Sequence, residues 1–119
     1  MIFGDEAVAK LRHLYPAAWT YFGQFESFDN FEQHLRNGPW DVVECSLCWV
    51  MVQFLSHDEV VIHWFCPVGA DIAALRRIFD HIFDSGVGVV YGEVPHGHVS
   101  ERKSRTLGRA LGFVRDSGS

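Results

Sequence analysis

Residues 59–94 read EVVIHWFCPVGADIAALRRIFDHIFDSGVGVVYGEV, and this stretch decides the fold. Glu59–Phe65 is rich in β-forming residues and apolar on both faces, as expected for a central strand that is covered on both sides. A helix follows Cys66–Ala70, and its apolar stripe consists of Ile72, Leu75, Ile78, Phe79 and Ile82. The strand after that helix, Val87–Val94, is expected to run parallel to Glu59–Phe65, because a helix connects them.

Cap and stop residues mark the ends of this helix and of the next one. Asp71 is a candidate N-cap or first-turn acid, and Ser85-Gly86 is a stop signal. Farther along, Ser100 begins a basic helix whose buried side consists of Leu107, Ala110 and Leu111. The C-terminal half therefore alternates strand, helix, strand, helix and strand.

Two amphipathic helices are expected in the N-terminal third. The first is capped by Asp5, ends at Pro16 and buries Val8, Leu11 and Leu14. The second is capped by Ser27 or Asp29 and buries Phe28, Phe31 and Leu35. Between the helices, residues 17–25 read AAWTYFGQF without a clean period, so this segment lines a groove, joins the core or forms a contact surface.

The stretch Trp40–Phe65 carries the antiparallel part of the sheet. It contains DVVEC, then LCWVMVQFL, then EVVIHWF, with Ser56-His57-Asp58 as a hairpin signal, which indicates two or three strands. The expected class is α/β (α+β), with a mixed central sheet, antiparallel N-terminal strands, a parallel strand-helix-strand crossover and helices on both faces. A length of 119 residues suits a single domain, residues 1–119.

Composition narrows the function classes. A net charge of -5 makes a nucleic-acid partner unfavourable, although five of the ten Lys and Arg residues lie in the basic segment Arg102–Arg115. No apolar run has the length of a membrane helix, and the start MIFGDEAVAKLRH does not resemble a signal peptide. We therefore expect a cytoplasmic protein that does not associate with a membrane. Three cysteines are an odd number, which disfavours a disulfide framework.

The stretch from Glu59 to Val114 resembles the GNAT acyltransferase family in its order of elements and in two motifs, Gly92-Glu93-Val94-Pro95 and Leu111-Gly112-Phe113. A strand ending in Gly-x-Val-Pro, then an Arg-rich helix and Ala-Leu-Gly-Phe, also resembles short phage-encoded GNAT-like proteins, some of which are associated with virion or head assembly. The resemblance implies a GNAT-like fold. It also implies that backbone amides of the loop Val68, Gly69, Ala70 and Asp71 would hold the pyrophosphate of acetyl-CoA.

The chain departs from the family pattern at the positions that carry chemistry. Pro67 removes an amide donor from the loop, and Asp71 places a carboxylate near the phosphate position. Glu101 and Gly108 stand where the family has an Asn and a Tyr acid. In an active protein Tyr91 or a water would replace the missing acid, and His63 or Glu59 would serve as the base.

Two functions therefore follow from the resemblance. The favoured one is a GNAT-fold protein with a degenerate acyl-CoA site that acts in binding or virion assembly, through a protein partner or self-association. Its contact surface would be Trp19–Phe25, unless this segment packs in the core. The alternative is an active acetyl-CoA-dependent N-acetyltransferase that acts on a small-molecule or protein amine.

A further alternative is a zinc-binding interaction module. Cys45-x-x-Cys48 and His63-x-x-Cys66 contain four side chains of the types that bind zinc. However, residues three apart on one strand project to opposite faces, so Cys45 and Cys48 converge only if the strand bends. Buried, apolar cysteines are the favoured interpretation, and His96-Gly97-His98 is a weaker metal candidate.

Overall fold

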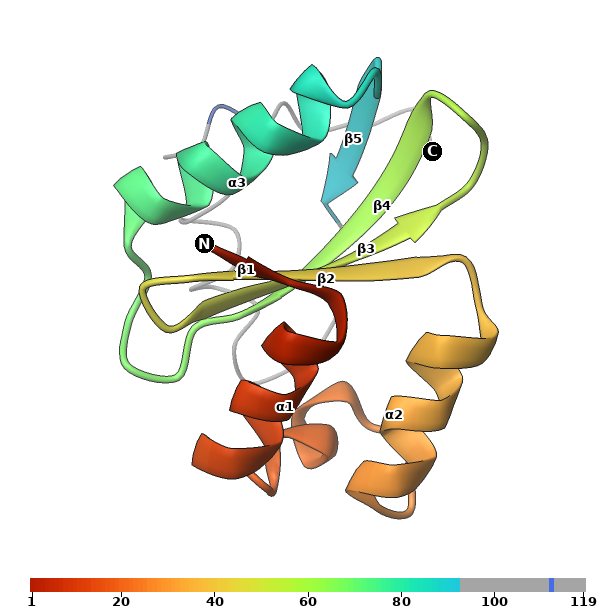
Figure 1. Ribbon diagram of the computed structural model, residues 1–119, viewed down its shortest axis with the longest axis vertical. Coiled ribbons are helices and arrows are strands. Elements are labelled where there is room, and N and C mark those ends of the chain that lie inside the picture. The colour runs from red at the N-terminus through yellow and green to blue at the C-terminus, as the bar shows by residue number, and fades with distance from the viewer. Residues whose placement is uncertain (93–111, 113–119) are drawn as a thin grey trace.

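A computed structural model describes residues 1–92 and Gly112, and these residues form a mixed sheet with helices on both faces (Figure 1). The sheet has five strands in the order β1-β2-β3-β4-β5. The elements in chain order are β1 Ile2–Phe3, α1 Gly4–Leu14, the 3-10 helix η1 Ala18–Phe22, α2 Phe28–Asn37, β2 Trp40–Cys45, β3 Cys48–Phe54, β4 Glu59–Phe65, α3 Ile72–Asp84 and β5 Val89–Gly92.

The parallel crossover predicted from residues 59–94 is present. Helix α3 connects β4 to β5, and these two strands pair in parallel from Glu59↔Val89 to Ile62↔Gly92. The other neighbouring strands pair antiparallel. The mixed α+β class with helices on both faces of the sheet is therefore confirmed. The strand predicted over Val87–Val94 begins at Val89 rather than Val87, and its residues beyond Gly92 lie outside the described part.

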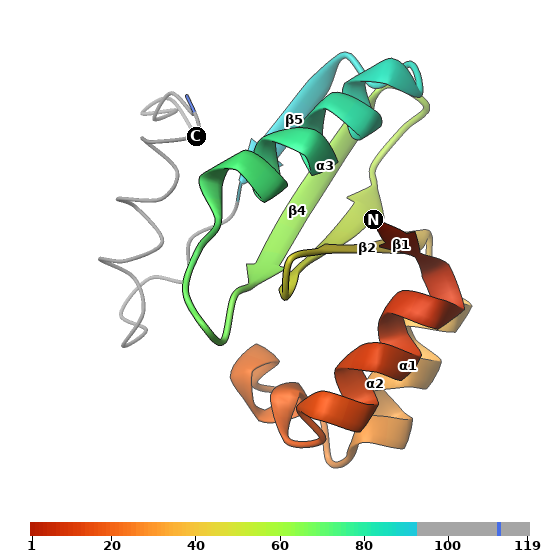
Figure 2. The ribbon, with the colours of Figure 1, turned by 60° about the vertical axis from the view of Figure 1, so that its left-hand side comes forward.

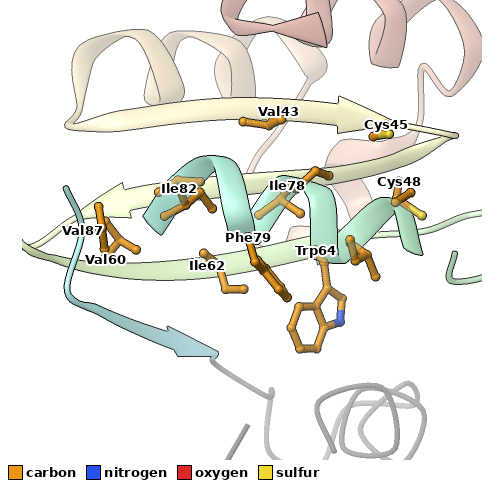
Figure 3. Packing of buried hydrophobic residues seen from close by; sticks show 14 residues of the cluster. Val43, Cys45, Cys48, Val60, Ile62, Trp64, Ile78, Phe79, Ile82 and Val87 are labelled. Atoms are coloured by element: carbon orange, nitrogen blue, oxygen red, sulfur yellow. The ribbon is translucent and has the colours of Figure 1, made fainter. Parts of the chain in front are cut away.

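One face of the sheet is covered by α3. The amphipathic pattern of this helix buries Ala74, Leu75, Ile78, Phe79 and Ile82. They pack against aliphatic residues of β2, β3 and β4 and against Cys45 and Cys48 (Figure 3). Asp71 is the N-cap of α3, and Ser85 is its C-cap, as the sequence indicates. We call this layer the aliphatic face.

The opposite face carries α1, α2 and η1 (Figure 2). Its cluster is rich in rings: Trp49 lies beneath Tyr15 edge-on at 5.7 Å, and Phe22 stacks on Phe31 at 5.2 Å. Ala18 is buried, and the aromatic residues of the segment 17–25 that pack against the cluster are Trp19, Phe22 and Phe25. Of the three alternatives for this segment, core packing therefore describes these four residues. We call this layer the aromatic face.

The N-terminal helices differ from expectation in detail. Ser27 caps α2, since its hydroxyl accepts a hydrogen bond from the Asn30 amide at 3.1 Å. Asp5, in contrast, lies in the first turn of α1, and Phe3 is the N-cap, because the two-residue strand β1 runs directly into the helix. Leu14 is 45% exposed rather than buried, so the inward side of α1 consists of Ala7, Val8 and Leu11.

A two-residue turn joins β2 to β3. Ser46 and Leu47 both have positive φ, 53° and 62°, which is the geometry of a type I′ hairpin. The buried Glu44 carboxylate accepts hydrogen bonds from the Leu47 amide at 3.1 Å and from Lys10 Nζ at 2.7 Å. One buried charge thus stabilises the turn and ties it to α1. In the part of the chain described, no helix has both the length and the apolar character that spanning a bilayer requires.

Candidate functional site

The loop between β4 and α3 holds the four residues predicted to bind acyl-CoA. Val68, Gly69, Ala70 and Asp71 are all exposed, and Gly69 has a φ of +112°, which L side chains rarely adopt. The Gly69 amide donates to the Cys66 carbonyl at 3.2 Å, which closes the turn after β4. The structure therefore places these residues together at the N-terminus of α3.

Several amides at this helix end already have partners within the chain. The Asp71 carboxylate accepts from the Ala74 amide at 3.1 Å, and the Asp71 carbonyl accepts from the Leu75 amide at 3.0 Å. The Asp71 amide itself donates to Cys48 Sγ at 3.5 Å. The negative charge that complements the helix dipole is consequently the side chain of Asp71.

The three catalytic candidates lie on the aromatic face of the sheet, but they do not form one cluster. Tyr91 is paired with Val61, so it shares a face with Glu59, and its hydroxyl donates to Glu59 Oε2 at 3.1 Å. His63 lies four residues farther along β4, about 13 Å from Glu59. Its ring packs against Trp40, with the ring centroids 5.6 Å apart.

These candidates also differ in their distance from the loop. Glu59 and Tyr91 are near the start of β4, whereas the loop follows its end at Phe65. A strand of this length measures about 20 Å. The Glu59–Tyr91 pair is therefore separated from the loop by the length of the strand, and His63 is the candidate nearest to it.

The three cysteines form a row across three neighbouring chain segments. Cys45 on β2 pairs with Cys48 on β3, and both lie on the aliphatic face (Figure 3). The register Trp49↔Phe65 brings Cys66, one residue farther, opposite Cys48. Cys66 is half-buried and packs against the same cluster. We call these residues the cysteine row.

Hydrogen bonds to Cys48 favour its thiolate. The Cys66 thiol donates to the Cys48 sulfur, and together with the Asp71 amide it lowers the pKa of Cys48 from 9.0 to about 7, although burial opposes this shift. The same hydrogen bond, with burial and the nearby Cys48 charge, raises the pKa of Cys66 above its ordinary value. The pair therefore loses one proton readily and the second with difficulty.

The cysteine row corrects the prediction about how Cys45 and Cys48 are placed for zinc binding. Cys45 and Cys48 do not belong to a single strand, because the turn at Ser46-Leu47 separates them and returns both side chains to the same face. His63 pairs with Met51 and lies on the opposite face, so the sheet separates it from the cysteines. Among the described residues, no three side chains of His, Cys, Asp or Glu are placed to hold a metal ion.

A groove with a volume of about 400 Å³ lies between α1, α2 and β2. Trp40, Asp41 and Arg36 line it, and the Arg36 guanidinium is 3.3 Å from Glu32 and 3.7 Å from Asp5. None of the sequence-based site residues borders this groove. The residues that line the groove come from three elements that are separated in the sequence, so no single motif predicts it.

Several predicted features lie outside the described residues. They are the histidines His96 and His98, the basic segment Arg102–Arg115, and the departures from the family pattern at Glu101 and Gly108. The chain matches no family model, no curated protein and no solved structure. Its class rests on the fold: a mixed α+β protein with a five-stranded sheet among the described residues.

Proposed function

We propose that this chain is a GNAT-like protein with a degenerate acyl-CoA site, acting in binding or virion assembly as its resemblance to phage-encoded proteins implies. The described topology is compatible with that family: antiparallel first strands, a parallel β4–α3–β5 crossover, and an exposed loop before α3. Such a protein would act in the host cytoplasm or in the virion.

One observation carries the degenerate-site part of the proposal: the Asp71 carboxylate caps α3 with its oxygen 3.1 Å from the Ala74 amide. A pyrophosphate at this helix end would have to displace that carboxylate and would then be repelled by it. The Asp71 amide is also engaged, with Cys48. The Asp71 carboxylate thus already complements the positive end of the α3 dipole, without a ligand.

Thermal unfolding with acetyl-CoA tests this part. A ligand that binds only the folded state raises the melting temperature, and we expect no rise at millimolar acetyl-CoA. Asp71→Asn is the informative variant, because an amide oxygen still caps the helix while the negative charge is gone. A rise in the unaltered protein that Gly69→Asp abolishes would refute the degenerate site.

The assembly part predicts self-association. Exposed apolar side chains available for contact include Phe54, Leu55, Val68 and Phe83. Light scattering coupled to size-exclusion chromatography should give a mass that rises with concentration above the 13.5 kDa of one chain. A strictly monomeric chain that also acetylates amines would contradict this part.

The hydrogen bond between Tyr91 and Glu59 favours the second candidate, an active N-acetyltransferase. Glu59 would accept a proton from the attacking amine, and Tyr91 would protonate the departing CoA thiolate. Under this candidate, Glu59→Gln and Tyr91→Phe each lower the rate of CoA release by about 10²-fold or more. CoA release that is no faster than in buffer alone would contradict the acetyltransferase and favour the first candidate.

A further inference from the structure

The cysteine row has a chemistry that the proposed function does not use. We propose that Cys48 and Cys66 are a redox-active dithiol, which a hydroperoxide oxidises to an intramolecular disulfide while Cys45 stays reduced. This inference is independent of acyl-CoA binding and of assembly, because it rests only on the end of β3, the end of β4 and the loop before α3.

The register places the two sulfurs within reach of each other. Cys48 is one residue before Trp49, and Cys66 is one residue after Phe65, which are cross-strand partners. Opposed residues of antiparallel strands have Cβ atoms about 4.5–5.5 Å apart, and a disulfide needs about 3.5–4.5 Å. Cys66 also packs against the cluster that contains Cys48, and its thiol lowers the pKa of Cys48.

The surroundings of Cys48 make it the nucleophile of the pair. The Asp71 amide, directly before the first turn of α3, donates to Cys48 Sγ at 3.5 Å. Donors at a helix N-terminus stabilise a thiolate in the same way that they stabilise other anions. Cys66 supplies a second donor, so the thiolate forms near neutral pH, where the pKa of Cys48 is about 7.

Access to the pair comes from the side of Cys66. Cys48 is fully buried, whereas Cys66 is half-buried, and the loop that follows it is exposed from Pro67 through Asp71. Gly69 gives this loop a residue without a side chain, with open space around the position where a Cβ would stand. Under this proposal a small hydroperoxide reaches Cys48 when the loop is displaced, which breaks the hydrogen bond from Cys48 Sγ to the Gly69 carbonyl at 3.8 Å but none of the pairing between β3 and β4.

The reaction balances with hydroperoxide as the oxidant. The Cys48 thiolate attacks one peroxide oxygen, the O–O bond breaks, and hydroxide leaves from hydrogen peroxide, giving a sulfenic acid. The Cys66 sulfur then attacks Cys48, its proton passes to the departing hydroxyl, and water leaves as the S–S bond forms. Two thiols and one peroxide thus give one disulfide and two waters.

Cys45 is the natural internal control. It is paired with Cys48 across the turn Ser46-Leu47, whose two positive φ angles and bond to the Glu44 carboxylate leave little freedom. Joining Cys45 to Cys48 would deform this turn, whereas Cys66 lies where β4 has ended and the loop begins. The tight turn thus selects Cys66 as the partner.

The test is oxidation of the reduced full-length chain with hydrogen peroxide, followed by thiol titration and intact mass. Of the three thiols, two should disappear, and the mass should fall by two hydrogens. Peptide mapping should join Cys48 to Cys66. Their loss should speed up with rising pH, reach half of its limiting rate near pH 7 and level off roughly one to two pH units higher, as the thiolate fraction does.

Matched variants sharpen the result. Cys45→Ser should form the same disulfide at the same rate, while Cys66→Ser should gain oxygen at Cys48 instead of forming a disulfide. Survival of all three thiols in the unaltered chain, a Cys45–Cys48 bond or an intermolecular disulfide would overturn the proposal. The measurements on the unaltered chain decide the matter even if a variant fails to fold.

Discussion

The two faces of the sheet are built from different side chains. The aliphatic face consists mainly of Val, Ile, Leu and Cys residues under the single helix α3, with Trp64 and Phe79 as its aromatic members. The aromatic face consists of rings from α1, η1, α2 and the strands, with polar groups among them: Trp49 Nε1 donates to the Ala7 carbonyl at 2.9 Å. The aliphatic face is therefore held mainly by apolar packing, with Cys48 as its hydrogen-bonded member, while the aromatic face depends more on hydrogen-bond geometry.

The difference follows from how each layer is connected. Helix α3 follows β4 directly in the chain, and its regular pattern matches a regular sheet surface. The layer on the other face contains two helices and an irregular segment, and large rings in edge-to-face contact fill the spaces between them. The layer under α3 is thus packed mainly with aliphatic side chains, while the irregular layer contains many more aromatic ones.

Truncation at the centre of the aromatic face should have the largest effect. Trp49 is 0% exposed and contacts Tyr15, so Trp49→Ala should lower the free energy of unfolding by about 3–5 kcal/mol. Trp49→Phe keeps a ring but removes the donor to the Ala7 carbonyl, and should cost about 1–3 kcal/mol. Urea denaturation measures both, and a loss close to zero in Trp49→Phe would show that the hydrogen bond contributes nothing.

The aliphatic face should respond to volume alone. Ile78 on α3 is 0% exposed, so Ile78→Ala should cost about 2–5 kcal/mol in urea denaturation. Ile78→Val removes one methyl group and should cost about 0.5–1.5 kcal/mol. A loss from Ile78→Val as large as that from Ile78→Ala would contradict a well-packed aliphatic layer.

Cys48, the hydrogen-bonded side chain on the aliphatic face, should make the free energy of unfolding depend on pH. The pKa of Cys48 is about 7 in the folded chain and 9.0 in the unfolded one, so between these values the unfolded chain binds the extra proton. Stability should therefore rise from pH 7 to 9, by on the order of 2 kcal/mol.

Above pH 9 the trend should reverse, because the raised pKa of Cys66 keeps a proton that the unfolded chain releases. Urea denaturation of the reduced protein across this range measures the effect. Cys48→Ser is the control and should flatten the rise. If the free energy of unfolding of the unaltered protein did not change with pH over this range, the pKa values of Cys48 and Cys66 would not be shifted.

The two helix caps should give the smallest effects. Ser27 caps α2 on the aromatic face, and Asp71 caps α3 on the aliphatic face. Ser27→Ala and Asp71→Ala should each cost about 1 kcal/mol by thermal or urea denaturation. Replacing Asp5 with Ala, in contrast, should change stability less, because Asp5 lies in the first turn of α1 and caps nothing.

Local signals predicted much of the framework. The pattern of Glu59–Phe65 fixed β4 to the residue, and Asp71 and Ser27 were correctly identified as caps. Strand β1 was missed, since two residues carry no periodicity. The end of α1 was misjudged for another reason: spacing placed Leu14 on the buried side, but no element covers the last turn enough to bury it.

The candidate site was predicted less well than the fold. The loop Val68–Asp71 lies together because it is continuous in the chain, whereas Glu59 and His63 share a strand but lie four residues apart. The spacing Cys45-x-x-Cys48 argued for opposite faces unless the chain bends between them, and the bend was not predicted because Ser46-Leu47 lacks the Asn or Gly typical of a type I′ turn. Glu44, the buried acid that holds the turn, was missed for the same reason.

The sequence by itself determined the three α-helices of the described residues, the central strands and the parallel crossover, because periodicity and caps act between residues close along the chain. The tertiary structure alone decided which side chains meet: Cys48 with Cys66 and with the amide of Asp71, Tyr91 with Glu59, and His63 with Trp40. These contacts depend on strand register, and a shift of one residue would move every side chain of a strand to the other face. Register is set by the packing of the whole sheet, which no short pattern contains.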